Sequence, residues 1–148
     1  MLFLQKSQNK SLAIILFGGI KLKILINKIN KDTEDIIVGF SMEFGSGTAV
    51  WNGNRIAEKD KEYDVQYDIT DSLVWGKDVV LSEEKKFNIS GTEEEVFITG
   101  ILERIYSDGL VDLRFGDSII QIEMEGNNLP KGEYVKVRAD SLEVYDVN

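Results

Sequence analysis

The feature that most constrains the fold of this chain is the alternation of apolar and polar side chains within Lys131–Asp146, KGEYVKVRADSLEVYD. Three apolar positions alternate there with three polar ones, namely Val135, Val137 and Ala139 with Tyr134, Lys136 and Arg138. A period of two predicts a β-strand with one buried face and one solvated face. From residue 22 onward no window shows sustained helical periodicity, so the sequence predicts an all-β protein.

Short strands separated by turns are predicted throughout the chain after residue 21. The other expected strands are 22–29, 36–44, 48–51, 63–69, 73–81, 87–89, 95–106, 110–115 and 118–124. A hairpin turn is predicted at Gly45–Gly47. Strands of this length and spacing indicate small antiparallel barrels or sandwiches, because these architectures leave few bare edges.

A weaker copy of the last stretch lies upstream at Lys61–Trp75, KEYDVQYDITDSLVW. Its alternating apolar residues recur at an offset of 70 residues, and the tripeptide DSL of residues 71–73 returns as residues 140–142. Two small β-units in tandem are therefore predicted, over 22–82 and 87–148. A duplication would explain the copy, but the hairpin Ser118–Met124 has no counterpart upstream, so the origin of the units stays open. Units of about 60 residues have thin cores, and we expect the two to lean on each other.

Residues 1–21 differ in composition from the rest of the chain. They hold three lysines and no acid, and Leu12–Ile20 is continuously apolar. This outlines a signal peptide, but no small-residue cleavage site follows. Gly18–Lys21 is also what an in-frame translation of a purine-rich ribosome-binding site would give. We therefore expect residues 1–21 to be an extension, mis-called or disordered, and the mature protein to begin at Leu22.

The charge and the missing residue types limit the function. The chain has 26 acidic residues against 17 Lys and Arg, for a formal charge of -9. A field of this sign repels nucleic-acid phosphates and favours basic partners. There is no histidine and no cysteine, which excludes the commonest general base, thiolate catalysis and most transition-metal sites. We expect a cytoplasmic protein that binds no cofactor, nucleic acid or membrane.

No catalytic or metal constellation is predicted. Asp64 and Asp68 share one strand face but lie roughly 13 Å apart along it, too far to share a proton. Glu93–Glu95 lacks the spaced oxygens of a calcium loop. The glycines at 45–47 do not lead into a helix, so they do not form a phosphate loop.

Two tryptophans are the candidate partner-binding residues. Each can be core, or it can be an exposed anchor of the kind that dominates interfaces. If exposed, they would be surrounded by acids that suit a basic protein partner. The candidate set is Trp51, Trp75, Glu58, Asp60, Glu62, Asp71 and Asp78.

The alternating stretch from Gly132 to Tyr145 resembles the closing strand of OB-like or SH3-like small barrels. The resemblance implies a barrel for residues 87–148, and OB-folds commonly bind oligonucleotides. This chain departs from that pattern, since from Glu83 onward 15 acids face seven bases. In size and acidity the chain is also similar to small bacterial immunity proteins that bind toxins.

The sequence thus predicts a non-catalytic acidic protein, of immunity or inhibitor type, that binds a basic protein partner such as a toxin. A barrel module binding a small ligand or oligomer, and a carboxylate-dependent hydrolase, remain as alternatives. A cleft in which two acids converge would favour the hydrolase. The oligomeric state is left open.

Overall fold

The computed structural model describes residues 22–147, and within that range every regular element is a β-strand. The predicted all-β class is confirmed. Residues 1–21, the expected extension, lie outside the described residues. The strands are β1 (Leu22–Asn30), β2 (Ile37–Met42), β3 (Gly45–Trp51), β4 (Glu62–Asp68), β5 (Ser72–Val74), β6 (Val79–Leu81), β7 (Asn88–Gly91), β8 (Val96–Ile105), β9 (Leu110–Phe115), β10 (Ser118–Glu125), β11 (Tyr134–Ala139) and β12 (Glu143–Asp146).

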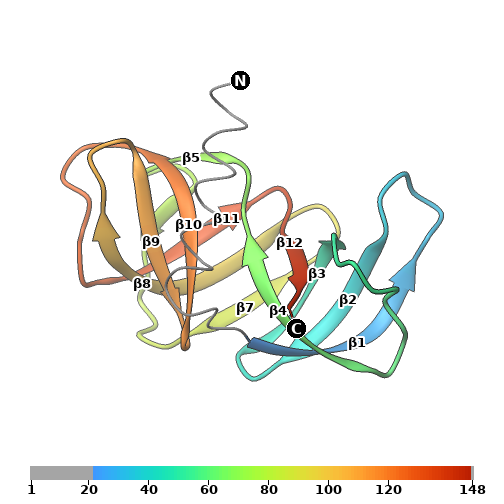
Figure 1. Cartoon of the computed structure of the whole chain (residues 1–148). Coiled ribbons are helices and arrows are strands. Elements are labelled where there is room, and N and C mark those ends of the chain that lie inside the picture. The colour runs from blue at the N-terminus through green and yellow to red at the C-terminus, as the bar shows by residue number, and fades with distance from the viewer. Residues whose placement is uncertain (1–21, 148) are drawn as a thin grey trace.

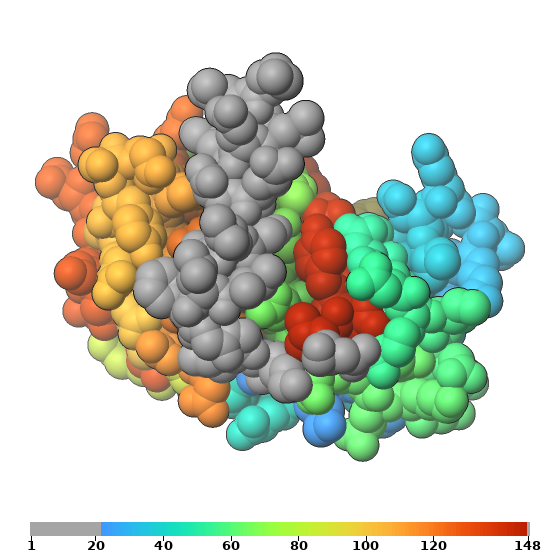
Figure 2. All heavy atoms as spheres, in the orientation of Figure 1, coloured from blue at the N-terminus to red at the C-terminus, as the bar shows by residue number. Residues whose placement is uncertain are grey.

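Five of these strands close into a small barrel in the order β1-β2-β3-β12-β4 (Figure 1, right). β1 pairs antiparallel with both β2 and β4, and β2 pairs antiparallel with β3. The barrel closes through β12, which runs parallel to β3 and antiparallel to β4. Figure 2 shows the red atoms of β12 between the green atoms of β4 and the turquoise atoms of β3. Backbone bonds from Val50 N–H to the Leu142 carbonyl (2.8 Å) and from Asn52 N–H to the Val144 carbonyl (2.9 Å) hold the parallel contact. Closure gives each of the five strands a neighbour on both sides.

Six of the seven strands between β4 and β12 form a second sheet in the order β5-β10-β9-β8-β11-β6 (Figure 1, left). Its end strands β5 and β6 are joined by a tight turn at 75–78, in which Gly76 N–H bonds to the Val79 carbonyl at 2.8 Å. β7 pairs with β8 and meets β3 at Gly45. β7 therefore connects the second sheet to the barrel.

The hairpin turn between β2 and β3 lies earlier than predicted, at Glu43 and Phe44, and the glycines of 45–47 belong to β3. Gly45 has a φ of 139°, and a Cβ there would lie 2.1 Å from the Ile89 carbonyl oxygen. The glycine is therefore required for the close approach of β7 to β3 rather than for the turn.

The barrel and the second sheet bury one continuous apolar core. Phe115 of β9 packs edge-on against Tyr67 of β4, with 5.8 Å between ring centroids, and against Phe44, with 5.3 Å. Phe87, just before β7, contacts both Phe44 and Phe115. Such aromatic pairs contribute about 0.5–1.5 kcal/mol each beyond the area they bury. The two regions therefore stabilise each other.

The two similar sequence stretches are the places where the chain crosses between the barrel and the second sheet. Lys61–Trp75 holds β4 and β5 and leads out of the barrel, and Lys131–Asp146 holds β11 and β12 and leads back. The crossings lie side by side, since Asp140 N–H donates to Asp71 Oδ2 at 3.1 Å. The tandem duplication is not confirmed, because β12, which falls in the range 87–148, completes the barrel formed by β1 to β4.

Candidate functional site

Trp51, one of the two candidate anchors, is buried at the end of β3 with 6% of its surface exposed. Its Nε1 donates to the Arg55 carbonyl at 2.9 Å. Its ring meets Tyr63 edge-on, with 5.0 Å between centroids. Trp51 therefore holds the loop 52–61 against the barrel, and little of its ring is exposed.

The acids predicted around Trp51 follow it in this loop and at the start of β4. Glu58, Asp60 and Glu62 are all exposed. Glu58 pairs with Lys61 at 2.7 Å, and Asp60, at a positive φ of 67°, donates its N–H to a β1 carbonyl at 2.7 Å. Neither contact involves the Trp51 ring, which is itself buried, so the three carboxylates do not surround an exposed indole ring.

The second candidate group lies at the second sheet. Trp75 is half-buried in the turn 75–78 and packs against the core. Asp78 of the same turn accepts a backbone N–H of β5 at 2.9 Å and lies 3.7 Å from Arg138. Asp71 accepts the hydrogen bond that joins the two crossings. The structure therefore divides the seven predicted residues between two places, one in the barrel around Trp51 and one at the crossings.

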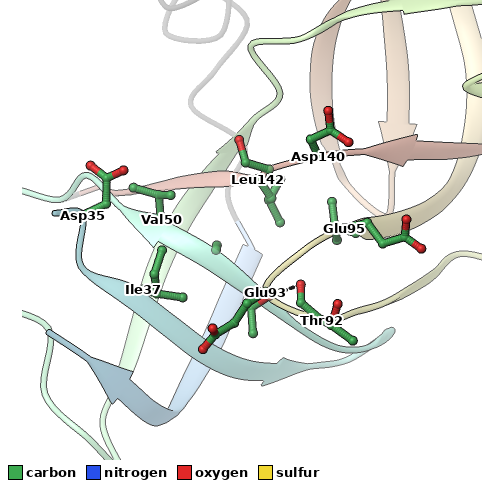
Figure 3. Close-up of a pocket in the computed structure, with 12 residues that line it drawn as sticks. Asp35, Ile37, Val50, Thr92, Glu93, Glu95, Asp140 and Leu142 are labelled. Carbon is green, nitrogen blue, oxygen red and sulfur yellow. Dashed lines mark hydrogen bonds between the residues drawn. The ribbon is translucent and has the colours of Figure 1, made fainter. Parts of the chain in front are cut away.

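A different set of acids lines a cleft of about 230 Å³ between the barrel and the second sheet. Four of its twelve lining residues are acidic and none is basic. Figure 3 shows these four side chains at the rim of the hollow, with the carboxylate of Glu95 turned away from its centre. They are Asp35, Glu93, Glu95 and Asp140.

The cleft forms where β7 and β12 diverge along the same edge of β3. β3 pairs with β7 at Gly45 and with β12 from Val50 onward. Between these points Thr48 faces the cleft, and its hydroxyl donates to the Thr92 carbonyl at 2.5 Å. Asp35 comes from the loop before β2, Glu93 and Glu95 from the turn before β8, and Asp140 from the returning crossing. Three separate segments thus supply charge of one sign.

One cation lies beside the cleft without lining it. Arg138 Nη1 is 3.1 Å from Asp140 and 3.5 Å from Glu95. The hydrogen bond to Asp140 and the charge of the neighbouring acids raise the pKa of Arg138. Arg138 compensates at most part of this charge, and Asp35 and Glu93 remain exposed at the cleft. The cleft is therefore suited to a cationic ligand.

Asp146, at the end of β12, fixes the loop 52–61. The side chain of Asp146 is 2% exposed, and its carboxylate accepts hydrogen bonds from Asn54 N–H at 2.7 Å and from Arg55 Nε at 2.7 Å. Burial by itself would raise the pKa of the Asp146 carboxyl, but the hydrogen bonds from Arg55 and Asn54 outweigh it and the pKa lies below its usual value. The last strand thus closes the barrel and also positions the loop at its mouth.

Sequence reasoning missed the cleft because its acids are distant in the chain. In the sequence, Glu93–Glu95 stands out only as a candidate calcium loop, and no local pattern marks Asp35 or Asp140.

Within residues 22–147, no three or more Asp and Glu side chains are grouped so that they could hold a metal ion. None of the same residues forms a helix long and apolar enough to cross a bilayer.

The site and the fold together define an all-β protein with a closed five-stranded barrel and an acidic cleft. Comparison with protein-family models, with curated proteins and with solved structures finds no match.

Proposed function

We propose that this chain is a non-catalytic binding protein that takes a basic segment of a protein partner in the acidic cleft. The observation that carries the proposal is the lining of the cleft, in which four acids occur without a single base. A partner with lysine and arginine side chains is the complement of such a surface, and charge complementarity would set the rate and orientation of encounter.

The position of the cleft supports a binding role. The strand order β1-β2-β3-β12-β4, with the last strand parallel to the third, resembles that of OB-type barrels. Such barrels bind ligands on the face of their second and third strands, beside the loop after the first strand and the segment before the last. In this chain the cleft is lined by β2, β3, the loop before β2 and the segment before β12.

The charge of the cleft distinguishes the ligand from the oligonucleotides that such barrels commonly bind. Nucleic acid would bring phosphates next to Asp35 and Glu93, in a chain whose formal charge is -9. Phosphate binding requires the opposite sign of protein charge. A basic protein, of the kind that an immunity or inhibitor protein blocks, fits the charge, and we propose that the binding takes place in the cytoplasm.

A carboxylate-dependent hydrolase has less support. Glu95 and Asp140 are near enough to share the guanidinium of Arg138. Both carboxylates therefore contact the same arginine, whereas a glycosidase needs two carboxyl groups that flank the bond to be cleaved.

Fluorescently labelled octalysine tests the proposal. We expect binding at low salt that weakens at an ionic strength of about 0.15 M, where charges are screened beyond about 8 Å. The triple variant Asp35→Asn, Glu93→Gln, Asp140→Asn should lose roughly tenfold or more in affinity, about 1.4 kcal/mol.

The matched control neutralises three exposed acids outside the cleft, with the substitutions Glu43→Gln, Asp117→Asn and Glu125→Gln. This variant has the same net charge as the triple cleft variant. Its affinity for octalysine should therefore fall only by the small part that comes from the net charge of the whole protein. Equal losses in the two variants, no binding of octalysine, or tighter binding of octaglutamate would overturn the proposal.

A further inference from the structure

A second hollow opens at the mouth of the barrel, beside the acidic cleft. It has a volume of about 390 Å³, within the range of ligand pockets, and barrel mouths are common binding places. Its wall is largely apolar and includes Ile36, Trp51, Ile56 and Ala57. Ile56 is 77% exposed, more than any other large apolar side chain among the described residues.

The exposure of Ile56 does not come from a loose loop. The carbonyl of Ile56 accepts the Tyr63 hydroxyl at 3.2 Å, and that same hydroxyl accepts Glu58 N–H at 2.9 Å. On the other side, the Arg55 carbonyl accepts Trp51 Nε1 at 2.9 Å. Backbone groups on both sides of the Ile56 side chain are thus held, so the chain presents this side chain to solvent at a fixed place. A partner that covers this side chain gains the free energy of removing its apolar surface from water.

The mouth and the cleft share their wall, because successive residues of a strand point to opposite faces. Ile37 and Val50 form a register pair of β2 and β3, and both line the cleft. Their chain neighbours Ile36 and Trp51 are joined by a backbone bond of 2.9 Å, and both line the mouth. Asp35, which precedes Ile36 in the loop, lines the cleft.

We propose that the mouth of the barrel is an apolar anchor site for the same basic segment that the cleft binds. One large apolar side chain of that segment packs between Ile36 and Ile56 over the Trp51 ring, while neighbouring lysine or arginine side chains reach the acids of the cleft. This inference rests on the proposed function, and it specifies the partner as an amphipathic basic segment rather than a merely cationic one.

The charges that line the mouth predict whether a substitution there strengthens or weakens the binding of a basic peptide. Arg55 is neutralised by Asp146 through a 2.7 Å contact. Lys31 also lines the mouth, and it has no ion pair within residues 22–147. A free ammonium group repels a basic segment, so Lys31→Gln should tighten the binding of any lysine-rich peptide. An anionic apolar ligand would instead lose affinity in this variant.

The test compares octalysine with the same peptide carrying one central phenylalanine, both bound to the full chain. The phenylalanine should improve affinity about fivefold or more in the wild type. Ile56→Ser should abolish this gain and leave the affinity for octalysine unchanged. The matched control is Leu81→Ser, because Leu81 is 58% exposed but lies on β6, away from the mouth. That variant should keep the full gain.

The outcomes separate the two proposals. If octalysine binds but phenylalanine adds nothing, or if Ile56→Ser keeps the gain, the anchor site is overturned while the acidic cleft stands. If neither peptide binds, both fail. Tighter binding of phenylacetate than of phenethylamine, with loss in Lys31→Gln, would assign the mouth to a small apolar acid and overturn the inference. Self-association in sedimentation that Ile56→Ser removes would assign it to a second copy of the chain, with the same consequence.

Discussion

The second sheet and the barrel each contain a buried polar side chain, and the two side chains differ in whether their polar atoms have hydrogen-bond partners. In the second sheet, Asp112 of β9 is 6% exposed, and its carboxylate accepts the Tyr106 hydroxyl at 2.8 Å and Gln121 Nε2 at 3.0 Å. In the barrel, Tyr67 of β4 is 1% exposed, and its hydroxyl has no hydrogen-bond partner among the described residues. Burial raises the pKa of Tyr67, as expected for a phenol in apolar surroundings.

This difference shows which buried groups stabilise the protein. A buried polar atom without a partner costs about 1–3 kcal/mol, whereas a satisfied one is close to neutral or favourable. The hydrogen-bond network of Asp112 therefore stabilises the folded protein only while all of its partners are present. The Tyr67 hydroxyl is a cost that the core tolerates. Both groups sit next to the same shared core, so substitutions in either region can be compared on one unfolding transition.

The largest effect is expected for Phe115→Ala, which removes the ring between the two regions. Phe115 is fully buried and contacts rings from both sides of the boundary. The free energy of unfolding should fall by about 3–5 kcal/mol, because a buried aromatic is replaced by a cavity. Urea denaturation followed by circular dichroism measures this loss.

The same experiment tests whether the two regions unfold together. Trp51 reports on the barrel and Trp75 on the second sheet, so Trp75→Phe and Trp51→Phe leave one fluorescent probe in each region. In each single-tryptophan variant, the fluorescence and circular dichroism midpoints should coincide, as two-state unfolding requires. A barrel that stays folded after the second sheet has unfolded would contradict the shared core.

A smaller loss is expected for Asp112→Ala, which leaves the Tyr106 hydroxyl and the Gln121 amide without their acceptor. The predicted cost is about 2–3 kcal/mol, because two partners of a charged group lose their hydrogen bonds. The control is Asp117→Asn in the exposed turn between β9 and β10, which should change stability by less than about 0.5 kcal/mol. If the two variants are equally stable in urea, the network does not distinguish the second sheet from the barrel.

The alternation in the sequence was enough to predict the strands but not their partners. Val135, Val137 and Ala139 are all buried, as their period of two indicates. The stretch Lys131–Asp146 is nevertheless two strands, because the chain crosses at 140–142 from the second sheet to the barrel. Which strand closes a barrel depends on contacts between residues far apart in the chain, and a local pattern does not contain them.

The candidate site was predictable only in part, for the same reason. The burial of Trp51 could have been read from its phase, since Gly47, Ala49 and Trp51 share one face of β3. With the hairpin turn predicted at Gly45–Gly47, Gly47 is assigned to the turn and its place on the same strand face as Trp51 is not recognised. No local signal joins Asp35 to Asp140, which come together only because β12 returns to the barrel. The overall acidity correctly indicated charge of this sign, but not where it collects.

The smallest change in the free energy of unfolding is expected for Tyr67→Phe. Unlike the losses predicted for Phe115→Ala and Asp112→Ala, this change is zero or an increase. Removing an unpartnered hydroxyl should leave the stability at neutral pH unchanged or raise it by up to about 1 kcal/mol. Because the pKa of Tyr67 is higher in the folded than in the unfolded chain, the wild type loses stability as the pH rises above about 10, the unfolded value. Tyr67→Phe lacks this group, so its advantage should grow between neutral pH and pH values above about 10 in urea denaturation. A clear loss of stability in Tyr67→Phe would mean that the hydroxyl has a partner, such as a buried water, and the contrast between the two regions would then fail.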